Sequence, residues 1–142
     1  NQLRGRRCLA TNSDTKVRIR YADHTRFYYP DAMVVCEPNS ENDSFQDRPE
    51  VIVEVLSDAT RRVDLGEKKE SYLSIRSLKV YLLVEQTRPR VLVYRRTDEG
   101  FAVEVCEGLD ATVDLSEVGC SIALNEIYDR VRFDRDSEEG EQ

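Results

Sequence analysis

The chain has 142 residues, of which 39% are hydrophobic and 35% are charged, and its net charge is −7 at neutral pH. This length fits one domain with one hydrophobic core, although the composition is polar for a globular protein. No apolar run approaches the ~18 residues that a membrane span requires, and the N-terminus lacks the zones of a signal peptide, so we expect a cytoplasmic protein without a membrane partner.

The first residues, 1–7 (NQLRGRR), fit the last turn of a helix. Because the chain begins at Asn1 and its one methionine is Met33, we expect that its N-terminus has been processed or that it is part of a longer protein. Charged and apolar residues then alternate over 16–21 (KVRIRY), which predicts a half-buried strand.

A second extended run covers 27–36, and its well-paired part is expected to start near Asp31, because Pro30 belongs at a strand start or at an edge. Residues 37–49 are rich in Pro, Asn, Ser and Asp and predict an exposed loop. The nearly all-apolar run 51–56 (VIVEVL) is typical of a central strand that is buried on both faces.

Apolar residues recur every three or four positions over 61–76, which predicts a helix. Strands at 78–85 and 90–96, joined by QTRP, form a predicted hairpin. The remaining predicted elements are strands at 101–106, 111–115 and 121–124 and a short helix at 125–131. This order indicates an α/β domain with a central mixed sheet, flanked by helices and continued by a C-terminal β-meander.

We assign residues 1–133 to this single domain and 134–142 to an acidic, disordered tail. The charge is uneven: residues 1–26 hold seven Lys or Arg and two Asp, whereas 37–50 and the tail each hold five acids and one Arg. An acidic chain can still carry a basic face, although its net charge disfavours tight non-specific binding to phosphate. The Arg-rich start therefore fits a solvated face as well as a nucleic-acid contact.

The four cysteines are Cys8, Cys36, Cys106 and Cys120, and none of them forms a CxxC pair. The single histidine, His24, leaves few further ligands, so a structural zinc site is disfavoured. We expect buried free thiols in a reducing cytosol.

Glu54 lies in the middle of the apolar run VIVEVL. An ionised carboxylate in a buried strand is costly unless it is paired or binds a metal. Three interpretations are open: the strand lies at an edge and Glu54 faces solvent, Glu54 is the structural partner of an arginine, or Glu54 lines a functional cleft.

Asp31 alone fits an ordinary turn before a strand, but it gains meaning if its strand pairs with the strand of Glu54. Both carboxylates could then point into one cleft, and two convergent carboxylates with open coordination positions suit Mg²⁺ or Mn²⁺. Lys68 and Tyr72 lie four residues apart on one face of the predicted helix. If this face covers the sheet, Lys68 could stabilise charge on a phosphate; otherwise it is a solvent-exposed lysine.

The segments YYPDAMVVCEP and PEVIVEVLSDATRRVDLGEKKESYLSIRSLKVYLLVE resemble the PD-(D/E)XK nuclease superfamily, and within it the Uma-type family of restriction-endonuclease-like proteins. The resemblance covers residues 21–128 and implies a restriction-endonuclease-like fold. The helix that usually precedes the first strand of this family is largely missing here, which leaves any acid on that helix unassigned.

The resemblance implies that Asp31 and Glu54 are metal ligands, together with the main-chain carbonyl of Val55. The lysine of the (D/E)XK element is normally two residues after the acid, where this chain has Leu56, so the resemblance assigns the lysine role to Lys68. Orienting or structural roles are implied for Ser57, Asp64 and Tyr72.

The implied activity is that of a nuclease, a DNA endonuclease in particular, which uses Mg²⁺ or Mn²⁺ to cleave phosphodiester bonds and can act as a homodimer. The alternative is a catalytically inactive nuclease-fold protein that serves as a nucleic-acid-binding or protein-binding module. A third interpretation, a structural domain without a ligand, requires Glu54 to face solvent.

Overall fold

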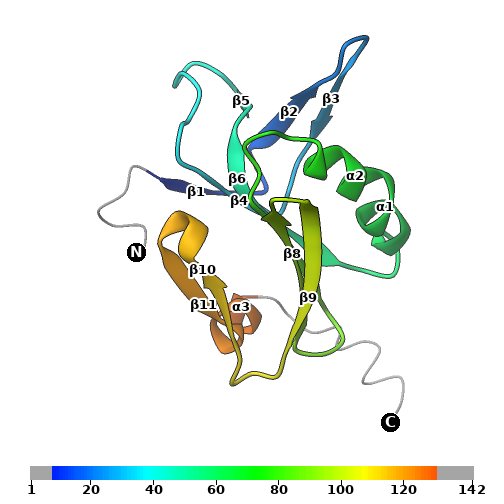
Figure 1. Cartoon of the computed structure of the whole chain (residues 1–142), viewed down its shortest axis with the longest axis vertical. Helices are drawn as coiled ribbons and strands as arrows, with labels where there is room; N and C mark the ends of the chain where they lie inside the picture. The colour runs from blue at the N-terminus through cyan, green and yellow to red at the C-terminus, as the bar shows by residue number, and fades with distance from the viewer. Residues whose placement is uncertain (1–7, 131–142) are drawn as a thin grey trace.

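The computed structural model describes residues 8–130, which are built around a mixed six-stranded sheet (Figure 1). In spatial order the strands are β1 (Leu9–Asn12), β4 (Ala32–Val35), β6 (Pro49–Leu56), β7 (Val80–Glu85), β8 (Arg90–Thr97) and β9 (Gly100–Glu107). Neighbouring strands run antiparallel, except that β6 and β7 are parallel. The predicted mixed sheet, its central strand β6 and the meander β7–β8–β9 are confirmed.

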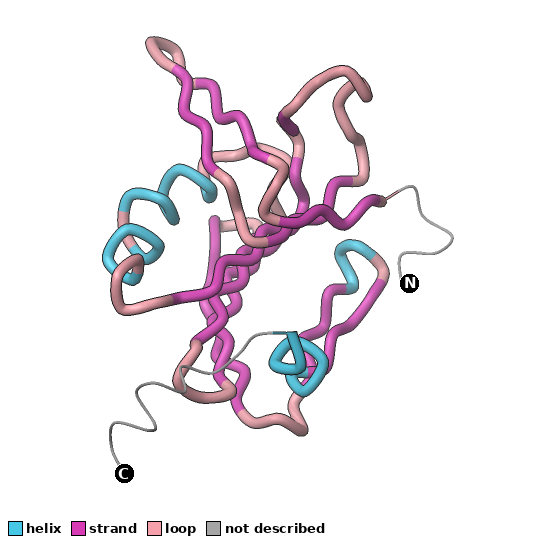
Figure 2. Tube along the Cα trace, turned by 180° about the vertical axis from the view of Figure 1, so that it is seen from behind, coloured by secondary structure: helices cyan, strands magenta, loops and turns pink. Residues whose placement is uncertain are grey.

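Each face of this sheet carries its own hydrophobic core. On one face, Ile52, Leu56 and Leu83 pack with Tyr72 from the helical segment. On the other face, alternate residues of the same strands, such as Val51 and Leu82, pack against the C-terminal elements. Figure 2 shows the helical segment and the C-terminal elements on opposite sides of the sheet.

The helical segment consists of two short helices, α1 (Arg61–Leu65) and α2 (Glu67–Leu73), so the prediction of one helix over 61–76 is wrong. The break falls at Gly66, whose backbone has φ −111° and ψ −107°. A Cβ atom at Gly66 would lie 2.8 Å from the carbonyl oxygen of Arg62, closer than side chains pack against backbone. The glycine therefore permits the close approach that redirects the chain into α2.

A second, three-stranded sheet projects from the main sheet and contains β2 (Lys16–Arg20), β3 (Thr25–Tyr28) and β5 (Phe45–Gln46) (Figure 1). The predicted exposed loop at 37–49 therefore contains a short strand, which pairs with β2 in parallel. This pairing places Arg18 against Asp47, with N–O distances of 2.8 and 2.7 Å. The hydrogen bond from Arg18 lowers the pKa of Asp47, and the basic start of the chain is thus partly neutralised by its acidic loop.

The C-terminal elements are the hairpin β10 (Thr112–Leu115) and β11 (Cys120–Ala123), the 3₁₀ turn η1 (Ser116–Val118) and helix α3 (Leu124–Arg130). They confirm the two strands and the short helix that the sequence predicts, within the described residues. Val113, Leu115 and Leu124 bury their side chains against the sheet. The hairpin and α3 therefore form the layer that covers the second face.

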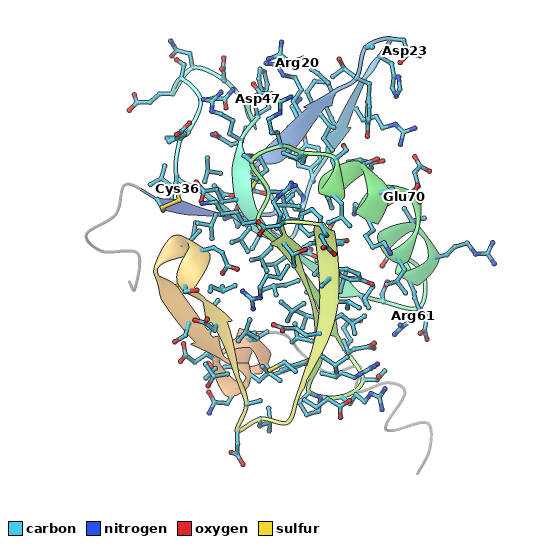
Figure 3. All side chains as sticks on the ribbon, viewed as in Figure 1. Arg20, Asp23, Cys36, Asp47, Arg61 and Glu70 are labelled. Carbon is cyan, nitrogen blue, oxygen red and sulfur yellow. A yellow bond between two sulfur atoms is a disulfide. The ribbon has the colours of Figure 1, made fainter. Side chains whose placement is uncertain are left out.

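Two of the four cysteines, Cys8 and Cys36, form a disulfide, so the expectation of four free thiols is wrong (Figure 3). The cause is non-local: β1 pairs with β4 so that Leu9 lies opposite Val35, which brings the two flanking cysteines together. Cys106 and Cys120 remain thiols and are half-buried.

Two predictions lie outside the described residues: the helix turn at 1–7 and the acidic tail at 134–142. Within residues 8–130, every helix is too short and too polar to cross a lipid bilayer.

Candidate active site

Asp31 and Glu54 meet at one end of two inner strands of the main sheet, where β4 begins and the second half of β6 passes. The two strands pair antiparallel with Ala32 opposite Val53, which places Asp31 beside Glu54. The main-chain N–H of Asp31 donates to Glu54 Oε1 at 3.1 Å, and the N–H of Val55 donates to Asp31 Oδ2 at 2.7 Å. The pairing that the sequence left as a condition is therefore present, and each acid is positioned by the backbone of the other strand.

Glu54 is buried, with 3% of its surface exposed, inside a strand that has neighbours on both sides. The interpretation of a solvent-facing edge residue is therefore wrong. The structural-arginine interpretation also finds no support among residues 8–130, because the cation at Glu54 is Lys68, with Nζ 2.7 Å from Oε2.

Helix α2 supplies both side chains that contact Oε2 of Glu54. Besides Lys68, the fully buried Tyr72 donates its hydroxyl to this oxygen at 2.9 Å. The spacing of four residues sets both side chains on the face of α2 that covers the sheet, as the sequence predicts. The interpretation of Lys68 as a solvent-exposed lysine is wrong, because only 18% of its side chain is exposed.

The surroundings of Glu54 shift its protonation equilibrium strongly. Burial raises the pKa of Glu54 from 4.5 to about 7, and this effect outweighs the opposite effects of the Lys68 ammonium and the Tyr72 hydroxyl. The nearby charge of Asp31 is a smaller contribution to the same increase. A carboxyl group that is half ionised near neutral pH, in contact with a second acid and a lysine, is typical of a functional site.

Val55 presents main-chain atoms to the site formed by Asp31 and Glu54. A residue in a strand projects its N–H and its C=O to the same side. Since the N–H of Val55 points at the Asp31 carboxylate, its carbonyl also faces the side of β6 where Asp31 lies. The sequence-predicted group of Asp31, Glu54, the Val55 carbonyl and Lys68 is therefore brought together in one place.

Two further residues for which the resemblance implies supporting roles, Ser57 and Asp64, belong to the segment that follows β6. Ser57 lies in the turn between β6 and α1, where its Oγ is 2.9 Å from Thr60 Oγ1 and its carbonyl accepts from the N–H of Arg61 at 2.8 Å. It shapes the turn that aims the helices at the sheet. Asp64 belongs to α1, and its side chain lies outside the described part of the structure.

Tyr28 is a neighbour that the sequence did not single out. Its ring packs edge-on against Tyr72, with centroids 5.4 Å apart, and lies 5.8 Å from Lys68 Nζ. The strand β3 that carries Tyr28 leads directly into Asp31. The only signal in the sequence was the run of aromatic residues before Pro30. This run does not indicate a functional role unless the position of α2 is known.

Glu85 is a second buried acid on the same face of the sheet. Parallel pairing places it opposite Leu56, at the end of β7, with 3% exposure. Arg61 of α1 lies 2.6 Å from it and Arg90 3.6 Å. The carboxylate of Glu85 thus joins α1 to the sheet, and the apolar run VYLLVE was the signal that its last residue is buried.

The oxygen atoms at the site formed by Asp31 and Glu54 fit a small divalent cation. Residues 8–130 contain no cluster of three or more His, Cys, Asp and Glu side chains, so a cation here would be held by two carboxylates and a carbonyl. Mg²⁺ is commonly bound by one or two carboxylates and keeps several waters. Asp31 is exposed, and its Oδ1 makes no hydrogen bond within the described region, which leaves it available as a ligand.

Comparison with known proteins identifies a family, two relatives and a similar solved structure. The sequence model of the Uma2 family, described as "Putative restriction endonuclease", matches residues 1–125. Two proteins of Synechocystis sp. strain PCC 6803, described as "Uncharacterized protein slr1290" and "Uncharacterized protein sll1609", are each 31% identical to this chain. The first match covers 94% of this chain and 70% of the relative, and the second covers 70% and 59%.

Among solved structures, the fold is similar to that of "a putative nuclease belonging to DUF820" from Anabaena variabilis, with a TM-score of 0.66 and 19% identity. The similarity covers 89% of this chain and 70% of that chain. It confirms the expected nuclease-like fold, while the extent of the family match settles the relationship. The chain belongs to the Uma2 family of restriction-endonuclease-like proteins.

Proposed function

We propose that this protein is a metal-dependent nuclease that hydrolyses phosphodiester bonds of DNA at the site formed by Asp31 and Glu54. The observation that carries the proposal is the convergence of two acids and a lysine, in which Lys68 Nζ lies 2.7 Å from Glu54 Oε2. Family membership supports the same chemistry, because the family description is that of an endonuclease.

The role of each residue follows from its position. Asp31 Oδ1, a Glu54 oxygen and the Val55 carbonyl would hold Mg²⁺ or Mn²⁺. The bound ion would supply Lewis-acid chemistry, which polarises the phosphate and makes a water more acidic. Tyr72 keeps Glu54 oriented through its hydroxyl hydrogen bond.

Lys68 has two partners in this proposal. Without a metal its ammonium neutralises Glu54. With a cation held by Glu54, the ammonium of Lys68 would instead be available to stabilise the negative charge that develops on the scissile phosphate.

The test combines metal binding with cleavage. Calorimetry with Mg²⁺ and Mn²⁺ on the wild type, Asp31→Asn and Glu54→Gln should show binding only in the wild type. Plasmid cleavage should be lost in both variants and also in Lys68→Met, which retains both carboxylates. Asp98→Asn, which removes an exposed acid in the turn between β8 and β9, is the control and should behave like the wild type.

The alternative function, a nuclease-fold binding module without catalysis, is favoured by one observation. The arginines near the start of the chain are engaged by acids, Arg18 by Asp47 and Arg26 by Glu67, which weakens the basic surface that a nuclease would use. A folded wild type that binds neither ion and cleaves no nucleic acid would contradict the nuclease and support this alternative.

Two accompanying predictions stay predictions. A homodimer would allow both strands of a duplex to be cut, and sedimentation with and without DNA would detect it. For the cytoplasmic location, the disulfide between Cys8 and Cys36 points the other way, because disulfides are typical of oxidising compartments.

A further inference from the structure

A pocket of about 480 Å³ opens between the β2–β3 hairpin and α2. The hairpin contributes Tyr21, His24 and Arg26 to its lining, and the helix contributes Glu67, Glu70 and Ser71. The proposed hydrolysis uses none of these side chains. In Figure 1 the β2–β3 hairpin projects past the helical segment on the side of the molecule that carries α2, and Figure 3 labels Glu70 on that segment.

The hairpin side of the pocket contains two aromatic rings. The rings of Tyr21 and His24 are stacked, with centroids 4.5 Å apart and planes at 17°. The main-chain N–H of Tyr21 donates to the carbonyl of His24 at 2.8 Å, which holds the turn between the two rings. Planar aromatic surfaces of this kind bind nucleic-acid bases by stacking, whatever the base.

The polar groups of the pocket add selectivity. Glu70 and Glu67 offer only acceptors, and no described residue pairs with the carboxylate of Glu70. Arg26 offers only donors, and it is held in place by Glu67 at 3.0 Å and by Ser71 Oγ at 3.1 Å. A planar ligand with donors on one edge and acceptors on another would match these groups.

Guanine is the nucleobase with this pattern. Its N1–H and N2 amino group lie side by side and can donate together to one carboxylate, whereas its O6 and N7 accept from an arginine. Adenine and cytosine lack the adjacent pair of donors, and thymine lacks an amino group.

The pocket is linked to the candidate active site through Tyr28. The Tyr28 hydroxyl donates to Glu67 Oε1 at 3.4 Å, and its ring lies 5.8 Å from Lys68 Nζ. We propose that the pocket binds an unpaired guanine of the nucleic-acid substrate, next to the phosphate at Asp31 and Glu54. This inference rests on the proposed nuclease function, for which it names the base that positions the substrate.

Binding is tested separately from cleavage. Fluorescence anisotropy is measured in EDTA with the full chain and short single-stranded oligothymidines that carry one guanine or, instead, one hypoxanthine, which lacks the N2 amino group. The wild type should bind the guanine oligonucleotide at least about fivefold more tightly, the lower end of the discrimination given by a bidentate contact.

Glu70→Gln should abolish this difference by weakening guanine binding. Removal of a negative charge would otherwise strengthen binding to a polyanion, so the expected sign is opposite to the general electrostatic effect. Glu126→Gln is the matched control, because Glu126 is also an exposed glutamate in the first turn of a helix, α3. Tyr21→Ala should weaken binding of both oligonucleotides through loss of stacking.

Equal binding of the two oligonucleotides by the wild type, no binding of either, or a Glu70→Gln variant that behaves like Glu126→Gln would overturn the proposal. Cleavage without guanine preference would support the nuclease function and contradict guanine binding in the pocket. Guanine-selective binding without any cleavage in Mg²⁺ or Mn²⁺ would support guanine binding and contradict the nuclease function.

Discussion

Lys68 Nζ lies 2.7 Å from Oε2 of Glu54, and this contact joins helix α2 to the central strand β6 through a carboxylate that is 3% exposed. A buried carboxylate of this kind depends on its cation, since no water can replace the lost charge. The ion pair therefore links α2 to the sheet, and it also contains the two charged groups that the proposed hydrolysis uses. Its two roles can be separated by measuring stability without metal.

Lys68→Met should lower the free energy of unfolding by about 3–5 kcal/mol near pH 8, because it leaves Glu54 buried and unpaired. The loss should shrink near pH 5.5, where Glu54 is protonated and needs no cation. Urea unfolding in EDTA at both pH values measures this. Lys79→Met is the control: Lys79 pairs with Glu50 at 3.0 Å but is 43% exposed, so its removal should cost less than about 1 kcal/mol. Equal losses for the two variants would contradict the prediction.

Glu54 should make the protein less stable as the pH rises. Its pKa is about 7 in the folded chain and 4.5 as an ordinary carboxyl, so between these values the folded state binds more protons than the unfolded state. The free energy of unfolding therefore falls from about pH 4.5 to pH 7, by roughly 3 kcal/mol in total for a shift of this size.

Glu54→Gln removes this titration, so the difference in stability between the variant and the wild type should change with pH across the same window. Chemical unfolding at several pH values gives the difference directly, and other acids cancel in the comparison. A difference that stays constant would show that Glu54 titrates outside this range.

The sequence predicted the residues of the candidate site better than their partners. The run VIVEVL predicted a central strand, but it left open whether Glu54 is buried or faces solvent. Helical spacing placed Lys68 and Tyr72 on one face. The choice among partners for Glu54 needed the packing of α2 on the sheet, which is non-local. Tyr28 was missed for the same reason: its role depends on where α2 lies.

The elements that the sequence missed are also set by distant contacts. Strand β5 exists because Lys16 and Val17 pair with Phe45 and Gln46, and local composition gives only an exposed loop there. The break at Gly66 could not be read from apolar spacing, which continues across it. A glycine inside a helical pattern signals a break only when a close backbone approach, here from Arg62, is known.

Gly66→Ala should lower stability by roughly 1–3 kcal/mol and should also abolish cleavage. The added Cβ would lie 2.8 Å from the Arg62 carbonyl oxygen, so α2 must move, and with it Lys68 two residues later. Gly100→Ala is the comparison: Gly100 has φ +112° and open space around it, at the start of β9. This control should lose stability through backbone strain while its cleavage rate stays unchanged. Intact cleavage in Gly66→Ala would show that Lys68 does not depend on the break.

The disulfide between Cys8 and Cys36 should contribute to stability under oxidising conditions only. Its two cysteines are 28 residues apart, and closing a loop of this length in the unfolded chain corresponds to about 3–4 kcal/mol. Dithiothreitol should therefore lower the wild-type free energy of unfolding by this amount and leave Cys36→Ser unchanged. Cys106→Ser, which alters a half-buried thiol outside the disulfide, should keep the full response to the reductant.

Because β1 pairs with β4 so that Asn12 lies opposite Ala32, next to Asp31, loss of the disulfide loosens the strand that presents this acid. The reduced protein should then bind Mg²⁺ more weakly, and unchanged metal affinity would show that β1 pairs with β4 firmly without it.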